Sequence, residues 1–340
     1  MNTAIALVPV FLLLALLQLM DSFKLVRPGN VIAAILAGAG AAVACLWLHE
    51  WFVEASGMDL TAFSRYVAPV SEEILKGAFV VWLLWRQRVG FLVDAAVQGF
   101  AIGAGFALIE NIDYLRHIGD AGLTLWLVRG LGTAVLHGAT TAVFAMVAKT
   151  LVDRRNERRA RALLPGLALA IGIHSAFNHV LLPPLAMTAL LLLVLPLVVL
   201  AVFQRSEAIT REWVGAGLDL EMELLHLVRS EHFLFTRFGR YLQELRARFG
   251  GPVVADMFCL LRLELELSVQ ARAMLIAREA GLEIPITADL HASLQEIDYL
   301  RASIGRTGLL ALRPLQVTSG RDHWNRYLLA NRRSVRRAEL

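Results

Sequence analysis

The residues best suited to chemistry are charged, histidine and amide side chains that stand inside strongly apolar stretches. Four such groups occur in chain order: Ser71-Glu72-Glu73-Ile74-Leu75-Lys76, Phe106-Ala107-Leu108-Ile109-Glu110-Asn111, His137, and His174-Ser175-Ala176-Phe177-Asn178-His179. An ionised side chain inside a membrane-spanning helix costs roughly 2.5 to 3.5 kcal/mol on insertion scales, so such residues usually mark a pathway, a buried pair or a reaction site. We therefore treat the four groups as one candidate site.

The residue types in these groups are sufficient for hydrolysis of an amide. A carboxylate such as Glu72 or Glu73 can act as a general base on a water molecule. Histidine can relay the proton, and together with an asparagine amide it can donate hydrogen bonds to an oxyanion. Lys76 would help to keep one carboxylate ionised. Together, these carboxylate, histidine and amide side chains predict peptide hydrolysis without a covalent intermediate.

The stretches that hold these groups have the length of membrane spans. The chain has 340 residues, is 57% hydrophobic and has a mean hydropathy of +0.59. Seven stretches approach the roughly 20 residues that a spanning helix needs, and they are 3–20, 31–53, 64–85, 91–113, 123–148, 163–182 and 185–204. Lipid offers no partners to backbone N–H and C=O groups, and the stretches lack the alternation of barrel strands. The sequence predicts an all-α, polytopic membrane helix bundle of about seven transmembrane helices.

The charges between the spans predict their orientation, because Lys and Arg accumulate in short cytoplasmic loops. The first, third and fifth connections are basic, with Lys24 and Arg27, then Arg86 and Arg88, then Lys149, Arg154, Arg155, Arg158, Arg159 and Arg161. The N-terminus is therefore predicted outside the cell membrane, and everything after residue 204 in the cytoplasm.

This orientation places the polar groups in one layer. At about 1.5 Å per residue, Glu72, Glu73 and His174 lie roughly 12 Å below the outer surface and His137 roughly 20 Å below it. Residues four apart share a helix face, which pairs Glu72 with Lys76 and His174 with Asn178. A further stripe of small residues leads to Glu110 and lets a neighbouring helix approach closely; it consists of Gly99, Gly103 and Ala107.

Composition also separates a second domain. Residues 205–340 contain 19 Arg, no Lys and 17 Asp plus Glu, with apolar residues at helical spacing and breaks at Gly250, Gly251 and Pro252. We predict a transmembrane domain over 1–204 and a small soluble, cytosolic α-helical domain over 205–340, for which a protein partner is the first expectation. Orientation in the membrane explains the basic residues better than nucleic acid does, so no nucleic-acid partner is predicted.

At the four polar groups the chain resembles the PrsW family of membrane proteases, relatives of the CPBP and Rce1-type glutamate-dependent intramembrane endopeptidases. The matching segments are E-E-I-L-K at 72–76, F-A-L-I-E-N at 106–111, H-G-A-T-T at 137–141 and H-S-A-F-N at 174–178. Their order also matches, and the resemblance covers roughly residues 64–182. Where Rce1-type relatives have a histidine in the second segment, this chain has Glu110 and Asn111, as PrsW-like proteins do.

The resemblance implies a peptidase that cleaves membrane-anchored proteins near the bilayer surface, the best-known family example being release of an anti-sigma factor. It implies that Glu72 activates water with support from Glu73, and that the other catalytic residues position the water or stabilise the oxyanion; these are His137, His174 and Asn178. Lys76, Glu110 and Asn111 take supporting positions.

Two other classes of function use the same residues. The carboxylates and histidines could bind a divalent cation in a transporter or in a metal-dependent membrane hydrolase. No H-E-x-x-H motif is present, Cys45 and Cys259 fit no metal-ligand spacing, and the chain has no internal repeat of the transporter kind. The motifs thus predict neither a metal site nor a cofactor. The third class is a catalytically silent membrane scaffold, which leaves the intramembrane carboxylates unexplained.

Overall fold

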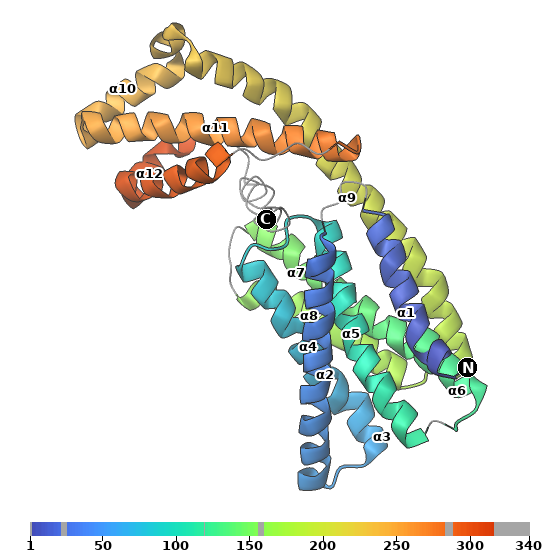
Figure 1. Cartoon of the computed structure of the whole chain (residues 1–340). Helices are drawn as coiled ribbons and strands as arrows, with labels where there is room; N and C mark the ends of the chain where they lie inside the picture. Colours follow the sequence, from blue (N-terminus) through green and yellow to red (C-terminus); the bar gives the residue numbers. More distant parts are fainter. Residues whose placement is uncertain (1, 22–25, 119, 156–159, 283–287, 316–340) are drawn as a thin grey trace, which may run out of the picture. The chain divides into compact units, whose positions relative to one another are not determined.

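The computed structural model describes residues 2–21, 26–118, 120–155, 160–282 and 288–315, and these residues form helices without any strand. Two compact units divide the chain, one of Met1–Glu207 and one of Ala208–Leu340. Figure 1 shows the helices of both units. The predicted all-α fold is confirmed over the described residues.

The first unit contains a helix in each of the seven predicted spans. In chain order its elements are α1 (Asn2–Leu19), α2 (Pro28–Ser56), α3 (Leu60–Ala62), η1 (Phe63–Val67), α4 (Ala68–Trp85), α5 (Leu92–Ile118), α6 (Leu123–Leu127), η2 (Val128–Thr133), α7 (Ala134–Arg155), η3 (Ala160–Ala162), α8 (Leu164–Asn178) and the first part of α9 (Pro184–Arg229). The segments η1 and η2 are π-helical turns, and each continues directly into a helix that carries part of the candidate site.

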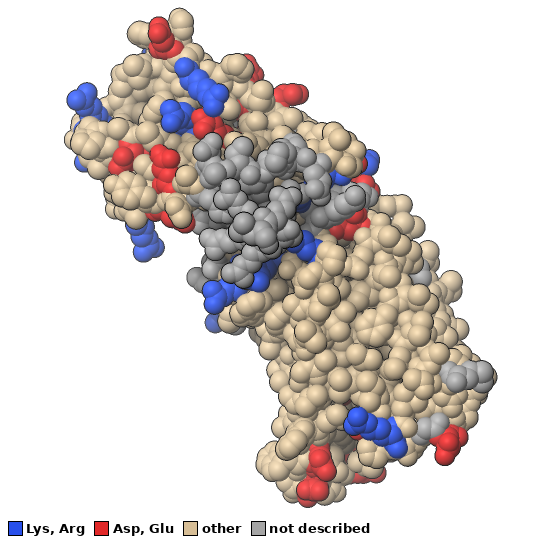
Figure 2. Space-filling model, in the orientation of Figure 1, with Lys and Arg blue, Asp and Glu red and all other residues tan. Residues whose placement is uncertain are grey.

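Length and composition make this unit a multi-pass membrane protein. Within the described residues, five helical stretches are long and apolar enough to cross a bilayer, and they are Asn2–Leu19, Pro28–Ser56, Leu92–Ile118, Leu123–Asp153 and Pro184–Glu212. Helix α8 is apolar but short, and the 18 residues of α4 include three charged side chains. Figure 2 shows that the surface of the first unit is largely uncharged on the face drawn. Lys24, Arg158 and Arg159 of the predicted basic loops lie outside the described residues.

Helix α5 is the central helix of the first unit. It packs against α2 and α7, and almost every residue of Val93–Ala107 is buried. Glycine allows these close approaches, because a Cβ atom at Gly103 would overlap the backbone of His137 in α7, and one at Gly105 would overlap Ile35 in α2. The predicted stripe of small residues is therefore confirmed at Gly103, where it brings α5 directly against the segment that holds His137.

The second unit is a group of packed helices. Its elements after α9 are η4 (Glu231–Phe235), α10 (Arg237–Phe249), α11 (Gly251–Glu279), α12 (Ala288–Leu312) and η5 (Arg313–Leu315). Helix α11 packs against both α10 and α12, and an ion pair of 2.9 Å between Arg272 and Glu221 is buried in this unit. Helix α9 continues through the boundary predicted at residues 204 and 205.

Candidate active site

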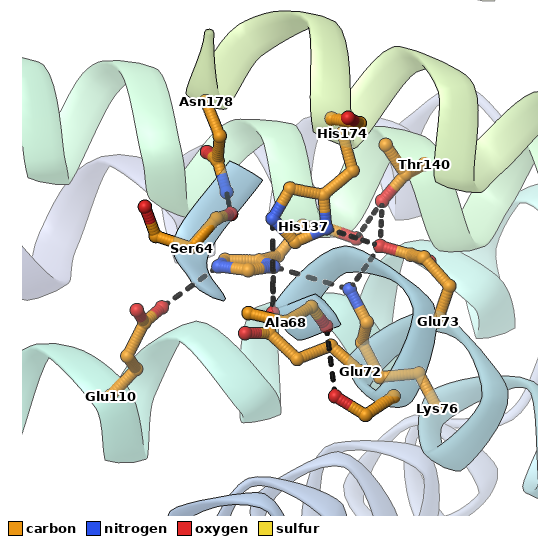
Figure 3. A network of polar contacts seen from close by, with 12 residues as sticks. Ser64, Ala68, Glu72, Glu73, Lys76, Glu110, His137, Thr140, His174 and Asn178 are labelled. Atoms are coloured by element: carbon orange, nitrogen blue, oxygen red, sulfur yellow. Dashed lines mark hydrogen bonds and ion pairs between the residues drawn. The ribbon is translucent and has the colours of Figure 1, made fainter. Parts of the chain in front are cut away.

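Four helices contribute the candidate residues. Glu72, Glu73 and Lys76 come from α4, Glu110 and Asn111 from α5, His137 from α7, and His174 and Asn178 from α8. Figure 3 shows most of these side chains converging between the helices, joined by a network of polar contacts. Residues from all four helices that were predicted to share one layer therefore lie close together, and several of them are in direct contact.

Glu73 is the most heavily hydrogen-bonded carboxylate of the network. Its Oε1 atom accepts from Lys76 Nζ at 2.6 Å, from Thr140 Oγ1 at 2.9 Å and from His174 Nδ1 at 2.9 Å. The side chain is 1% exposed. Such a carboxylate holds its neighbours in place, since three donors already occupy the oxygen atom that faces them.

The spacing placed Lys76 on the helix face of Glu72, and the structure shows that the carboxylate with which it forms an ion pair is Glu73. Lys76 forms its ion pair with Glu73, three residues earlier, and its Nζ atom also donates to His137 Nδ1 at 3.1 Å. Residues three apart and residues four apart both share a helix face. Spacing alone could not choose between the two carboxylates. The rotation of α4 in the bundle turns Glu73 toward α7 and α8, where its Oε1 atom accepts from Thr140 and His174.

Glu72 differs sharply from its neighbour. Its Oε2 atom is buried and has no hydrogen-bond partner among the described residues. The same atom lies 3.8 Å from His137 Nδ1 and 3.8 Å from His174 Nε2. A buried polar atom without a partner is costly, and in a native protein it points to a ligand, an ion or a water molecule.

The hydrogen-bond partners assign the tautomers of both histidines. His137 Nε2 lies 2.8 Å from Glu110 Oε2, and a carboxylate only accepts, so Nε2 carries the proton and Nδ1 is the acceptor. His174 Nδ1 donates to Glu73 Oε1, so the acceptor of the neutral ring is Nε2. The two rings meet edge to face at a centroid distance of 5.0 Å. Both unprotonated nitrogen atoms therefore lie near Glu72 Oε2.

This arrangement fits a divalent metal ion. Glu72, His137 and His174 each offer one ligand atom, and the three atoms lie within 4.8 Å of one another. Two histidines and one carboxylate form the protein ligand set of several catalytic zinc sites. Ligating histidines normally donate their other N–H group to a carboxylate, as His137 does to Glu110 and His174 does to Glu73. The motif search had indicated no metal ligands, because these three residues come from three separate helices.

A buried arginine that sequence reasoning left without a role belongs to the same network. Arg129, in η2, lies 3.1 Å from Glu110 Oε1 through Nη2 and donates from Nε to Asn111 Oδ1 at 3.0 Å. Its charge inside a predicted span was the only signal in the sequence. Its partners could not be identified from the sequence, because both lie on a different helix, α5.

Asn178 reaches the site region but is engaged elsewhere. Its Nδ2 atom donates to the backbone oxygen of Ser64 at 2.8 Å, and Ser175 Oγ donates to that of Arg65 at 2.7 Å. Both acceptors lie in the π-helical turn η1, so α8 holds η1 through these two side chains. The predicted face shared by His174 and Asn178 is present, since both residues line the same cavity.

A cavity of about 620 Å³ connects the network to the surface. Its inner part is lined by Glu72, His137 and His174, while exposed residues line its outer part, and they are Leu60, Ile118 and Val180. The outer residues lie at or beside the ends of α2, α5 and α8, at the side of the unit that the loop charges predict to face outward. Apolar residues therefore line the outer part of the cavity, together with the polar side chains of Asp113 and His117.

Comparison with known families agrees with this geometry. The sequence model of the PrsW family, described as PrsW family intramembrane metalloprotease, matches residues 27–203. The match covers more than half of the chain and includes every candidate residue. Comparison with curated proteins and comparison with solved structures gave no match. On the strength of the family match, the chain belongs to the PrsW family of intramembrane metalloproteases.

Proposed function

We propose that this protease is an endopeptidase that cleaves membrane-anchored proteins close to the outer surface of the cell membrane, with Glu72, His137 and His174 as its hydrolytic centre. The observation that carries the proposal is the convergence of Glu72 Oε2 with the unprotonated nitrogens of both histidines at the inner end of the cavity. The remaining polar side chains of the site orient these three groups.

Glu72 is the residue that acts on water in this proposal. Its free Oε2 atom can accept a proton from a water molecule as the oxygen attacks the carbonyl carbon of the scissile peptide bond. The same carboxyl group then gives the proton to the leaving amine when the C–N bond breaks. The products are a new carboxyl terminus and a new amino terminus. Glu73 supports the reaction by fixing His174, Thr140 and Lys76.

A divalent cation is the second element of the proposal, favoured by the clustering of the three ligand atoms. When bound, it would polarise the scissile carbonyl and make water a better nucleophile at neutral pH. Glu72, His137 and His174 would hold it, and in that state Glu72 Oε2 would be a ligand of the cation and would not be free to accept the proton of the water. Lys76 donates to His137 Nδ1, one of these ligand atoms, so Lys76 has to release that nitrogen before it can coordinate a cation.

The cavity and the family support the proposed class of substrate. A membrane-anchored regulator, such as an anti-sigma factor, would present an extended segment at the rim formed by Leu60, Ile118 and Val180. The proposed topology has the N-terminus outside and residues 205–340 in the cytoplasm, where this unit would bind a cytosolic protein partner.

The test compares cells that carry the wild type with cells that carry Glu72→Gln at matched expression, and it quantifies new termini of membrane proteins. Glu50→Gln is the matched control, because Glu50 is exposed near the end of α2. We expect at least one fragment of a membrane-anchored protein to disappear in Glu72→Gln and to persist in Glu50→Gln. Unchanged termini under several stress conditions would refute the peptidase and favour a scaffold.

A further inference from the structure

Arg129 is a nearly buried cation whose contacts join three parts of the membrane unit. Arg129 is 8% exposed, and its guanidinium carbon lies 3.5 Å from the centroid of the Tyr114 ring. One edge of the group contacts Glu110, and Nε donates to Asn111. A cation at this depth requires such partners, because its insertion into the apolar part of a membrane is costly.

Glu110 transmits the position of Arg129 to the candidate active site. Glu110 Oε1 lies 3.1 Å from Arg129 Nη2, while Oε2 accepts the proton of His137 Nε2 at 2.8 Å. The two oxygens belong to one rigid, planar group, so holding Oε1 also fixes the direction of Oε2. The direction of Oε2 in turn decides which nitrogen of His137 carries the proton.

Helix α1 holds the other side of Arg129. Asn111, which accepts from Arg129 Nε, donates from Nδ2 to the backbone oxygen of Ala6 at 2.7 Å. Pro9 lacks an N–H group, so the backbone oxygen of Ile5 has no helical donor four residues later. Gly130 lies directly against that oxygen, and a Cβ atom there would overlap it. These contacts tie η2 to α1, which precedes the residues matched by the family.

We propose that Arg129 is a positioning residue that acts through Glu110 to keep His137 in the tautomer with an unprotonated Nδ1, and that α1 fixes Arg129 through Asn111. The expected effect of Arg129 on catalysis rests on the proposed function, whereas its expected effect on the tautomer of His137 does not. Arg129 also lines the cavity that holds Glu72. A positioning residue changes kcat, whereas a residue that binds the substrate changes KM, so the second test below measures the two constants separately.

The first test reads the tautomer without any substrate. The full chain, labelled with ¹⁵N-histidine and placed in liposomes, is compared by solid-state NMR as wild type, Arg129→Lys, Arg129→Gln and the control Arg116→Gln. Arg116 is an exposed arginine on α5. The signals of His137 are assigned by their loss in His137→Asn. We expect one protonated and one unprotonated nitrogen in wild type and control, and a mixture of tautomers in Arg129→Gln. Wild-type signals of His137 in Arg129→Gln would overturn the proposal.

The second test measures cleavage of the substrate found with Glu72→Gln. Arg129→Gln should lower kcat by about 10- to 100-fold, as loss of a group that orients a ligand or catalytic residue commonly does, with little change in KM. Arg129→Lys should lie between Arg129→Gln and wild type. The double variant Glu110→Gln, Arg129→Gln should be no worse than the more damaging single variant, because both act as one unit. A raised KM with unchanged kcat would instead identify a substrate-binding residue and contradict the proposal.

The two tests separate the two ideas. If no substrate is found because Glu72→Gln leaves all termini unchanged, the peptidase proposal fails, and the NMR comparison still decides whether Arg129 positions His137. Size-exclusion profiles of the purified variants exclude misfolding, and Arg129→Lys supplies a variant that keeps the positive charge. The His137 signals of Arg129→Lys should lie closer to those of the wild type than the His137 signals of Arg129→Gln do.

Discussion

Lys76 and Glu73 form an ion pair with a distance of 2.6 Å between Nζ and Oε1, and their side chains are 0% and 1% exposed. Removing one member of such a pair leaves a buried charge without compensation, which typically costs about 3 to 5 kcal/mol. Glu72, the adjacent carboxylate, has an Oε2 atom without a hydrogen-bond partner among the described residues. The stability of the protein should therefore respond differently to the same substitution at the two neighbours.

Glu73→Gln should destabilise the folded protein, whereas Glu72→Gln should leave its stability close to that of wild type. Equilibrium unfolding of the full chain in mixed micelles with increasing SDS measures the difference. The double variant Glu73→Gln, Lys76→Met should recover part of the lost stability, because it removes both charges. Equal destabilisation by Glu72→Gln and Glu73→Gln would contradict the division of roles between the two carboxylates.

Gly103→Ala should disturb the site without altering any polar group. The added methyl group would meet the backbone of His137, and backbone cannot move aside as a flexible side chain can. Overpacking of this kind costs about 1 to 3 kcal/mol, and it should separate α5 from α7 where Glu110 meets His137.

Gly40→Ala is the matched control for this variant, because a Cβ atom at Gly40 would meet nothing within 4 Å. The control should keep full cleavage activity and a stability equal to or slightly above that of wild type, since alanine favours the helix. SDS unfolding and cleavage are measured for both variants. Wild-type behaviour of Gly103→Ala would show that α5 and α7 do not approach as closely as described.

Asn178→Ala should loosen the π-helical turn η1 more than it slows the chemistry. The amide donates to the backbone oxygen of Ser64, so its loss leaves that oxygen without this donor. Hydrogen exchange should rise over 63–67, and cleavage should fall by less than about tenfold. Loss of an oxyanion donor commonly costs about 100- to 1,000-fold in kcat. A loss of that size with unchanged exchange would restore the catalytic role that the resemblance implies for Asn178.

Removal of divalent metal should abolish cleavage, and Zn²⁺ should restore it. The direct measurement is the metal content of the purified full chain, determined by elemental mass spectrometry for wild type, His174→Ala and the control His117→Ala. His117 is exposed at the end of α5. We expect bound metal in wild type and control and a strong reduction in His174→Ala. Full activity of a preparation shown to contain no metal would leave Glu72 as the sole activator of water.

Much of the helical framework could be predicted from the sequence. Long apolar stretches identify spanning helices through their own composition, so each of the seven predicted spans contains a helix in the structure. The small residues before Glu110 indicated a close helix contact, which the structure places between Gly103 and His137. Charged, histidine and amide side chains inside the spans could be recognised because burying them in a membrane costs free energy. This criterion selected Glu72, Glu73 and His174 from the sequence.

The sequence by itself determined which residues are buried in an apolar environment, because hydrophobicity is a property of each local stretch. Only the tertiary structure decided which of them meet. The contact between Lys76 and His137 spans 61 residues of sequence, and that between Glu73 and His174 spans 101. The rotation of each helix about its axis turns Glu73 toward His174, leaves Glu72 Oε2 without a hydrogen-bond partner among the described residues and brings Arg129 to Glu110. That rotation is set by packing against other helices, which no single stretch of sequence contains.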